Sequence, residues 1–126
     1  MTRYYDTIAE FERDGYDIIV DKTCEDTNPR DLIDDGVDDL DQLCKDIDSG
    51  QVDWFMLRVR VLVEGLELAA THLGGCLYAN AKEVLVDGVA EDLIAEAMVE
   101  AKSQVYRLSK KFTQLSYAVD AEGCTA

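Results

Sequence analysis

The chain has 126 residues, of which 48% are hydrophobic, so it can bury one core and form a single domain (1–126). Its formal net charge of −15, from 27 acidic and 12 basic residues, opposes direct contact with nucleic acid or with an anionic membrane. No run approaches the roughly 18 to 20 apolar residues of a membrane span, and the first residues lack the apolar region of a secretory signal. We therefore expect a cytoplasmic protein.

The N-terminal segment shows helical spacing. Tyr4 or Tyr5, Ile8 and Phe11 recur every three or four residues, and Gly15 is a suitable stop. This spacing predicts a first helix over about residues 3–14. The apolar run that follows, residues 16–20, fits either an added strand or the start of the next helix.

Two short helices are predicted next. Asn28-Pro29 is a strong helix start, because asparagine caps free amides and proline is tolerated at the first helical position. A helix over about residues 29–35 would end at Gly36. From Val37 onward the apolar residues again share one helical face, and Ser49-Gly50 ends that second helix. The residues of this face are Leu40, Leu43, Cys44 and Ile47.

The best strand of the chain starts at Asp53. Its apolar residues alternate at period two, as in a strand with one face on a core, in the order Phe55, Leu57, Val59, Val61 and Val63. The opposite row contains both apolar and basic side chains and could face solvent or lie under another element: Trp54, Met56, Arg58, Arg60 and Leu62. Glu64-Gly65 offers a tight reversal, and the alternation restarts at Leu66, which predicts an antiparallel hairpin. A lone hairpin is barely stable, so we expect helices from both flanks to cover it.

After the hairpin, Gly74-Gly75 indicates a bend or bulge. Asn80 followed by Glu83 suits a capped short helix from Ala81 to about Asp87. Apolar residues then recur every three or four positions from Val89 to Leu115, which predicts one amphipathic helix of about 26 residues. Its small residues Ala97 and Ala101 allow close approach to the sheet, which is the favoured reading, or to a second copy of the helix. The predicted fold class is α+β, an antiparallel hairpin or small sheet packed by several short helices and this long C-terminal one.

No catalytic, cofactor or metal signature is present in the sequence. The four cysteines form no C-x-x-C pair, and His72 is the only histidine. His72 and Cys76 are four residues apart, so in a regular strand they share a side at a distance too great for direct proton transfer without a bulge. We therefore expect a protein that is not an enzyme and that holds no cofactor or metal.

Acidic residues concentrate between Asp14 and Asp53, where fourteen acids face three bases, a local balance of −11. On the two predicted helices, most of these acids would point outward together, although like charges at this spacing cost of order 0.2 to 0.5 kcal/mol per close pair. The stability of the fold alone would therefore not favour acids at these positions. The candidate binding residues are Asp31, Asp34, Asp35, Asp38, Asp39, Asp41, Asp46 and Asp48.

Three explanations compete for this acidic segment. Dense surface acid is a general means of solubility in crowded or salty surroundings. A calcium loop would require acids at positions three and twelve, but with Gly36 at position six these positions hold Ile33 and Gln42, so that pattern fails. The third explanation is imitation of nucleic-acid phosphates, because acids three or four residues apart on a helix lie roughly 5 to 6 Å apart, on the scale of the phosphate repeat.

In size, charge and clustering of acids, the chain resembles the small acidic DNA-mimic proteins of bacteriophages and mobile elements, which block restriction enzymes, CRISPR effectors or other DNA-handling enzymes. The resemblance implies an anti-restriction or anti-CRISPR type of inhibitor, without enzymatic activity, acting in the cytoplasm of a host cell. Its partner would be a basic nucleic-acid-binding protein. The alternative is a small adaptor or dimerisation module, a homodimer included, whose interface is the C-terminal helix and whose acidic surface serves solubility.

Overall fold

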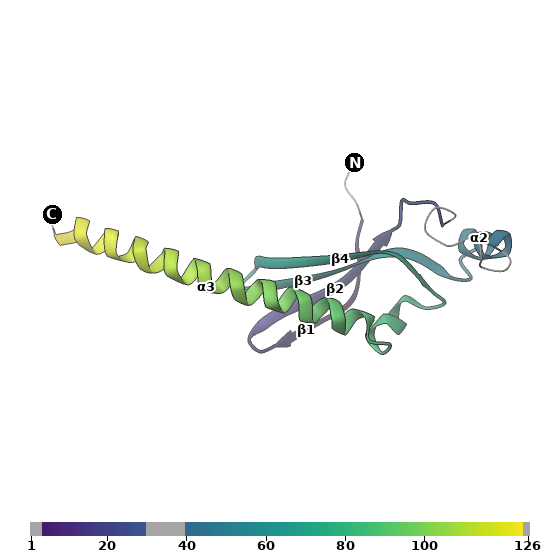
Figure 1. Ribbon diagram of the computed structural model, residues 1–126, viewed down its shortest axis with the longest axis horizontal. Helices are drawn as coiled ribbons and strands as arrows, with labels where there is room; N and C mark the ends of the chain where they lie inside the picture. Colours follow the sequence, from purple (N-terminus) through teal and green to yellow (C-terminus); the bar gives the residue numbers. More distant parts are fainter. Residues whose placement is uncertain (1–3, 30–39, 125–126) are drawn as a thin grey trace.

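The computed structural model describes residues 4–29 and 40–124, with side chains described as far as Tyr117. The fold is α+β. Its centre is an antiparallel sheet of four strands in the order β1-β2-β3-β4, and a long helix, α3, crosses one face of that sheet (Figure 1). The strands are β1 (Asp6–Arg13), β2 (Tyr16–Cys24), β3 (Asp53–Val63) and β4 (Leu66–Tyr78). The helices are α2 (Leu40–Asp48), the 3-10 helix η1 (Ala81–Leu85) and α3 (Val89–Cys124).

Two-residue turns close both hairpins. Asp14 and Gly15 have φ values of 54° and 86°, and Glu64 and Gly65 have 51° and 80°. Positive φ at both central residues gives the turn whose twist matches that of the flanking strands. The predicted reversal at Glu64-Gly65 is confirmed, whereas Gly15 lies in a hairpin turn and does not end a helix. Asp17, near the start of β2, pairs with Leu62, near the end of β3. The two hairpin turns therefore lie at the same end of the sheet.

The prediction of a helix over residues 3–14 is wrong, because Asp6–Arg13 form strand β1. The register on β2 shifts between Thr7 and Ala9, which leaves Ile8 as the extra residue of a bulge. A bulge reverses the alternation of sides, so Ile8 packs against the core together with Ala9 and Phe11. The ambiguous run at Tyr16–Val20 belongs to a strand, β2, which continues to Cys24.

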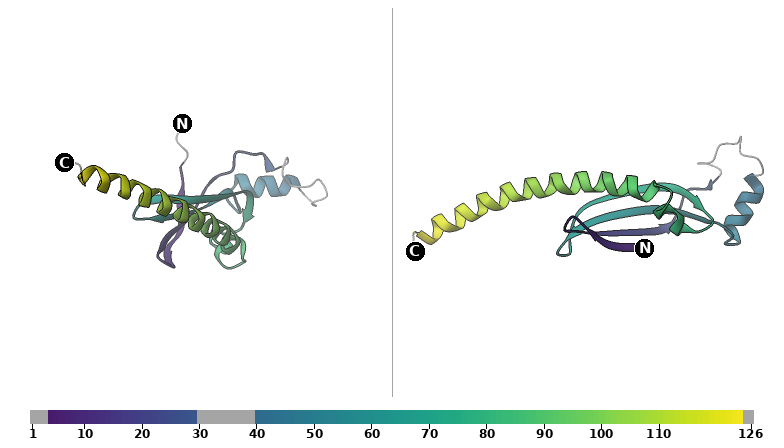
Figure 2. Two further views of the ribbon diagram at one scale, coloured as in Figure 1. Left: turned by 60° about the vertical axis from the view of Figure 1, so that its left-hand side comes forward. Right: turned by 90° about the horizontal axis from the view of Figure 1, so that it is seen from below.

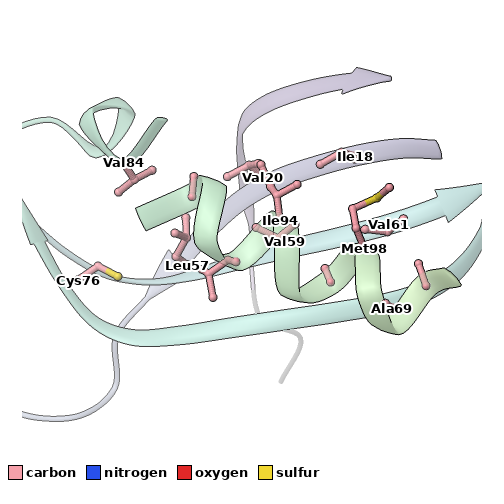
Figure 3. Packing of buried hydrophobic residues seen from close by; sticks show 14 of the residues in the cluster. Ile18, Val20, Leu57, Val59, Val61, Ala69, Cys76, Val84, Ile94 and Met98 are labelled. Atoms are coloured by element: carbon pink, nitrogen blue, oxygen red, sulfur yellow. The ribbon is translucent and has the colours of Figure 1, made fainter. Parts of the chain in front are cut away.

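The core lies between the sheet and α3 (Figure 3). The predicted inward row of β3 is confirmed for Phe55, Leu57, Val59 and Val61, of which the last three have no exposed surface, and Val63 is half-buried. Ile18 and Val20 of β2 extend this row. From α3 the core receives Ala90, Leu93, Ile94, Ala97, Met98 and Ala101. Ala97 and Ala101 are fully buried, and small side chains at these positions let the helix lie close to the sheet.

Helix α3 is longer than predicted, 36 residues in place of about 26. Its first half covers the sheet, and its second half continues beyond the end that carries the two hairpin turns (Figures 1 and 2). In front of it, Asn80 accepts a hydrogen bond from the Lys82 amide at 3.0 Å and caps η1, so the predicted short helix exists as one 3-10 turn.

The expectation that helices from both flanks cover the hairpin is only half right. From the N-terminal side the chain contributes two further strands, β1 and β2, which extend the sheet edgewise. Helix α2 lies beyond the far end of the sheet, opposite the C-terminus (Figure 1). Among the described helices only α3 and η1 pack on the apolar face of the sheet. The predicted helix at 29–35 lies almost wholly outside the described residues.

A bulge at Gly74-Gly75 confirms the predicted irregularity in β4. Phe55 pairs with Cys76 and Leu57 pairs with Leu73, so β4 has one more residue than β3 across this interval. The Glu25 carboxylate accepts a 2.7 Å hydrogen bond from the Gly75 amide. A Cβ atom on Gly74 would come within 2.9 Å of that carboxylate, so a larger residue at this position would force the Glu25 side chain to shift.

Candidate protein-binding surfaces

Helix α2 carries the candidate acids that lie within the described residues. Its predicted apolar face exists, but none of its residues is fully buried, and Leu43, Cys44 and Ile47 are half-buried. The helix ends with amides of Ser49, Gly50 and Gln51 bonded to carbonyls of its last turns, and Gly50 has a positive φ of 81°. α2 is therefore a small amphipathic element at one end of the molecule, outside the main core.

Three of the eight candidate acids are on α2. Asp41 and Asp48 are exposed and seven residues apart, which places them on the same side of the helix about 10 Å apart along its axis. Asp46 is half-buried and accepts a hydrogen bond from the Gln42 side chain at 3.0 Å. The structure thus brings Asp41 and Asp48 to one exposed face and gives Asp46 a local structural role.

The other five candidates lie outside the described residues. They are Asp31, Asp34, Asp35, Asp38 and Asp39. Their contribution to the same surface stays a prediction from their sequence spacing.

Other carboxylates, at the end of the sheet nearest α2, form contacts that stabilise the fold. Asp53 forms a 3.1 Å ion pair with Lys22, and Glu25 binds the amides of Gly75 and Thr27. The Trp54 indole donates a 3.0 Å hydrogen bond to the Thr27 carbonyl, which ties the start of the β2–β3 connection to the sheet. A hollow of about 750 Å³ separates this connection from α2, and it is lined by Cys44, Ile47 and Asp48 among others.

The sheet face turned away from α3 contains an ionic cluster that sequence reasoning missed. Asp21 is 2% exposed. It accepts hydrogen bonds from Arg58 Nε at 2.8 Å and from a second Arg58 nitrogen at 2.6 Å, and a nitrogen of Arg60 lies 3.6 Å away. The bond to Asp21 raises the pKa of Arg58 above its ordinary value. Tyr5 stacks on Arg58 with its ring centroid 3.5 Å from the guanidinium carbon.

This cluster explains the mixed row of β3. Arg58 and Arg60 lie on the face opposite the core, where no described helix covers the sheet (Figure 2). Asp21 pairs with Arg58 in the strand register, so cross-strand charge complementarity was the signal in the sequence. That signal becomes visible only once β2 is recognised as the neighbour of β3.

His72 and Cys76 do not form a catalytic pair. The bulge at Gly74-Gly75 reverses the alternation, so His72 pairs with Arg58 on the open face while Cys76 pairs with Phe55 on the core face. His72 is exposed and Cys76 is 5% exposed. Burial raises the pKa of the Cys76 thiol, which disfavours the thiolate that a nucleophile requires.

Two exposed side-chain contacts, one ion pair and one hydrogen bond, fix α3 and the segment before it. Arg13 of β1 and Glu91 of α3 form a two-bond pair at 2.9 and 3.0 Å, and this pair lowers the pKa of Glu91. The Tyr78 hydroxyl donates a 2.5 Å hydrogen bond to Asp87, which raises the pKa of Tyr78 to about 12 and lowers the pKa of Asp87. Asp87 also accepts the Val89 amide and so caps α3.

A second candidate surface lies where α3 leaves the sheet. We call it the apolar wedge, a hollow of about 530 Å³ between the projecting helix and the end of the β3–β4 hairpin. Its apolar lining consists of Val63, Leu66, Leu68, Val105, Leu108 and Phe112. Leu66 is 54% exposed and Phe112 is 58% exposed. Large apolar side chains grouped in this way are typical of an interaction site.

Among the residues that the structure describes, no group of three histidine, cysteine, aspartate or glutamate side chains is placed to hold a metal ion. None of the helices within these residues combines the length and the apolar character needed to cross a membrane. Comparison with protein-family models, with curated proteins and with solved structures found no match to this chain.

Proposed function

We propose that the chain is an acidic protein-binding inhibitor, without enzymatic activity, that occupies the nucleic-acid site of a basic DNA-handling protein. Bacterial restriction and CRISPR enzymes are such proteins. The observation that carries the proposal is the exposed pair Asp41 and Asp48 on α2, a helix at one end of the molecule with no fully buried residue. A surface built to hold DNA phosphates could bind carboxylates presented in this way.

The fold does not account for Asp48, whereas Asp41 lies in the first turn of α2, where the helix dipole favours an acid. Asp21 and Asp53 illustrate the contrast, because each pairs with a basic side chain of the sheet. Asp48 has no such pair among the described residues, and at the end of a helix a negative charge is unfavourable next to the helix dipole. An acid that costs helix stability and lies on the surface is better explained by a partner than by folding.

A basic partner would be attracted over a distance. Exposed charges steer association and are screened over about 8 Å at physiological ionic strength. Affinity should therefore fall as salt rises, and duplex DNA should compete, because both ligands would require the same basic groove.

The test is capture of DNA-handling proteins from bacterial lysate by the immobilised chain, with and without excess duplex DNA. One variant replaces six acids of the segment with Asn: Asp31, Asp34, Asp35, Asp38, Asp39 and Asp41. The matched control replaces six acids of β1, β2, β4 and the hairpin turns with the corresponding amides: Glu10, Glu12, Asp14, Asp17, Glu64 and Glu67. Both changes remove the same total charge.

We expect the first variant to stay folded and lose its partner, and the control to retain it. Capture that is indifferent to duplex DNA, or equal loss in both variants, would contradict mimicry. The acids would then be a solubility surface.

A second candidate function is supported by the apolar wedge. In this reading the chain is an adaptor or dimerisation module that binds through α3. Polar substitutions at Val105, Leu108 and Phe112 should then abolish partner binding, whereas the six Asn substitutions should not. The two readings are thus separated by the same capture assay.

A further inference from the structure

Strand β4 forms one edge of the sheet and pairs only with β3 (Figure 1). In an antiparallel ladder every second residue turns its amide and carbonyl away from its partner strand. The outer side of β4 therefore carries a row of backbone donors and acceptors. Within the described part of the chain, only β3 forms hydrogen bonds with the backbone of residues 69–72.

The two edges of the sheet differ in their protection against a further strand. Charged side chains and bulges prevent pairing at an exposed edge, and β1 has a bulge at Ile8 together with four charged residues: Asp6, Glu10, Glu12 and Arg13. By contrast, residues 68–78 of β4 contain no aspartate, glutamate, lysine or arginine. Between its two register shifts, β4 is regular over residues 69–73, which is the length of a typical strand. This part of β4 is the edge that remains open to pairing.

A hollow of about 440 Å³ lies beside this edge and is lined by Ala70, Thr71, Glu96, Val99 and Glu100. Ala70 and Thr71 are consecutive, so their side chains lie on opposite faces of the sheet. A hollow that both of them line must pass around the outer side of β4, because β3 occupies the inner side. We call it the edge groove, and its wall is α3.

One contact fixes the wall of the edge groove. The Thr71 hydroxyl donates a 3.1 Å hydrogen bond to the Leu93 carbonyl and so holds α3 against β4. Val99 is 72% exposed and offers an apolar side chain to whatever enters the groove.

The charge of the wall favours a basic occupant. Glu100 lies 3.8 Å from Arg107 and so has a counter-charge on its own helix. Glu96 is exposed and forms no ion pair within the described residues. Two β4 edges paired about a two-fold axis would place both α3 helices on the same side of the joined sheet and bring the Glu96 and Glu100 carboxylates of both copies together. Like charges at such a contact oppose it, so a second copy is the less favourable occupant.

We propose that the edge groove binds an extended segment of a partner protein, which adds to the sheet as a fifth strand beside residues 69–73. Its main chain supplies hydrogen bonds to the edge, and its alternate side chains supply specificity. On the side of α3, a lysine or arginine of the segment faces Glu96, and an aliphatic side chain two positions away faces Val99. This surface is separate from the acidic helix and from the apolar wedge, so the inference depends on neither candidate function.

The test uses an end-blocked peptide, Thr-Lys-Thr-Val-Thr-Lys-Thr, titrated into the full-length chain labelled with ¹⁵N. We expect the largest shifts of the amide signals at residues 69–73, together with slower hydrogen exchange of the outward-facing amides. Two N-methylated forms of the peptide give the decisive comparison, one methylated at the even positions and the other at the inner odd positions. Only one set of amides can face β4, so one form should lose binding and the other should retain it.

A pair of variants tests the charge of the wall. Glu96→Gln should weaken binding of the peptide by about threefold, because a single exposed ion pair contributes little. Asp92→Asn is the matched control, since it removes the same charge from the same helix outside the edge groove. This control should bind as wild type does.

Shifts absent from residues 69–73 with the peptide at roughly 1 mM, where even a weak complex is populated, would overturn the proposal. Equal effects of the two N-methylated forms would exclude strand addition. Equal weakening by Glu96→Gln and Asp92→Asn would show that the acidic chain attracts a basic peptide without a site. A chain that is dimeric by light scattering, with the amides of residues 69–73 protected in the absence of peptide, would make a second copy the occupant and so refute the inference.

Discussion

Replacing Asp21 with alanine should destabilise the fold more than the loss of any other acid among the described residues. Asp21 is 2% exposed and is the shared acceptor for Arg58 and Arg60. Removal of one member of a buried ion pair typically costs about 3 to 5 kcal/mol, because the remaining charge stays desolvated. Here the side chains of Arg58 and Arg60 are 18% and 27% exposed. Their partial hydration lowers the free-energy cost of losing Asp21. We expect about 2 to 3 kcal/mol.

The measurement is urea unfolding followed by circular dichroism, with the free energy of unfolding obtained by linear extrapolation. The matched control is Asp17→Ala, an exposed acid on the same strand and the same face, four residues away. The free energy of unfolding of this control variant should lie within about 0.5 kcal/mol of the wild-type value. Because a buried pair is poorly screened, the difference between the variants should persist in high salt. Equal stabilities for the two variants would refute the structural role assigned to Asp21.

Val59→Asp should unfold the domain, because Val59 has no exposed surface and its replacement would bury an unpaired carboxylate; a soluble variant with unchanged thermal melting would show that β3 is placed wrongly. Tyr78→Phe should return the pKa of Asp87 toward that of an ordinary carboxyl group, as measured by NMR titration. Since the folded pKa of Asp87 is lowered, its stabilising contribution is present above the ordinary carboxyl pKa and is lost as pH falls through the lowered value. Tyr78, with its pKa raised to about 12, contributes stability that is complete below its ordinary pKa and is lost as pH rises toward 12. A tyrosinate titration in which Tyr78→Phe leaves the most alkaline component unchanged would contradict this bond.

The β3–β4 hairpin could be predicted because its signals are local. The alternation from Phe55 to Val63 and the turn at Glu64-Gly65 depend only on neighbouring residues, and both are confirmed. The C-terminal helix was also predictable in kind. Its full length was not, because the prediction followed the apolar recurrence only as far as Leu115, whereas the helix continues to Cys124.

Strand β1 was not predictable, and the reason is a specific irregularity. A bulge at Ile8 puts Ile8 and Phe11 on the core side at a spacing of three, which imitates a helical face. Missing β1 also hid the second hairpin and, with it, the register that brings Asp21 opposite Arg58. For the acidic segment, the sequence identified Asp41 and Asp48 as exposed candidates. It did not indicate that their helix would lie beyond the end of the sheet, because that placement depends on how the β2–β3 connection is anchored at Glu25 and Trp54.

The order of the strands has a consequence for how the chain folds. Each strand pairs with its neighbour in sequence, and only the connection of residues 25–52 between β2 and β3 is long. Replacing its 28 residues with a four-residue turn would lower the entropic cost of closing that loop by about 1.7 kcal/mol. The mean sequence separation of contacting residues would also fall, and folding should become faster. The β2–β3 connection should thus slow assembly of the sheet, and a chain without it would still contain every strand of the sheet and the helix that covers it.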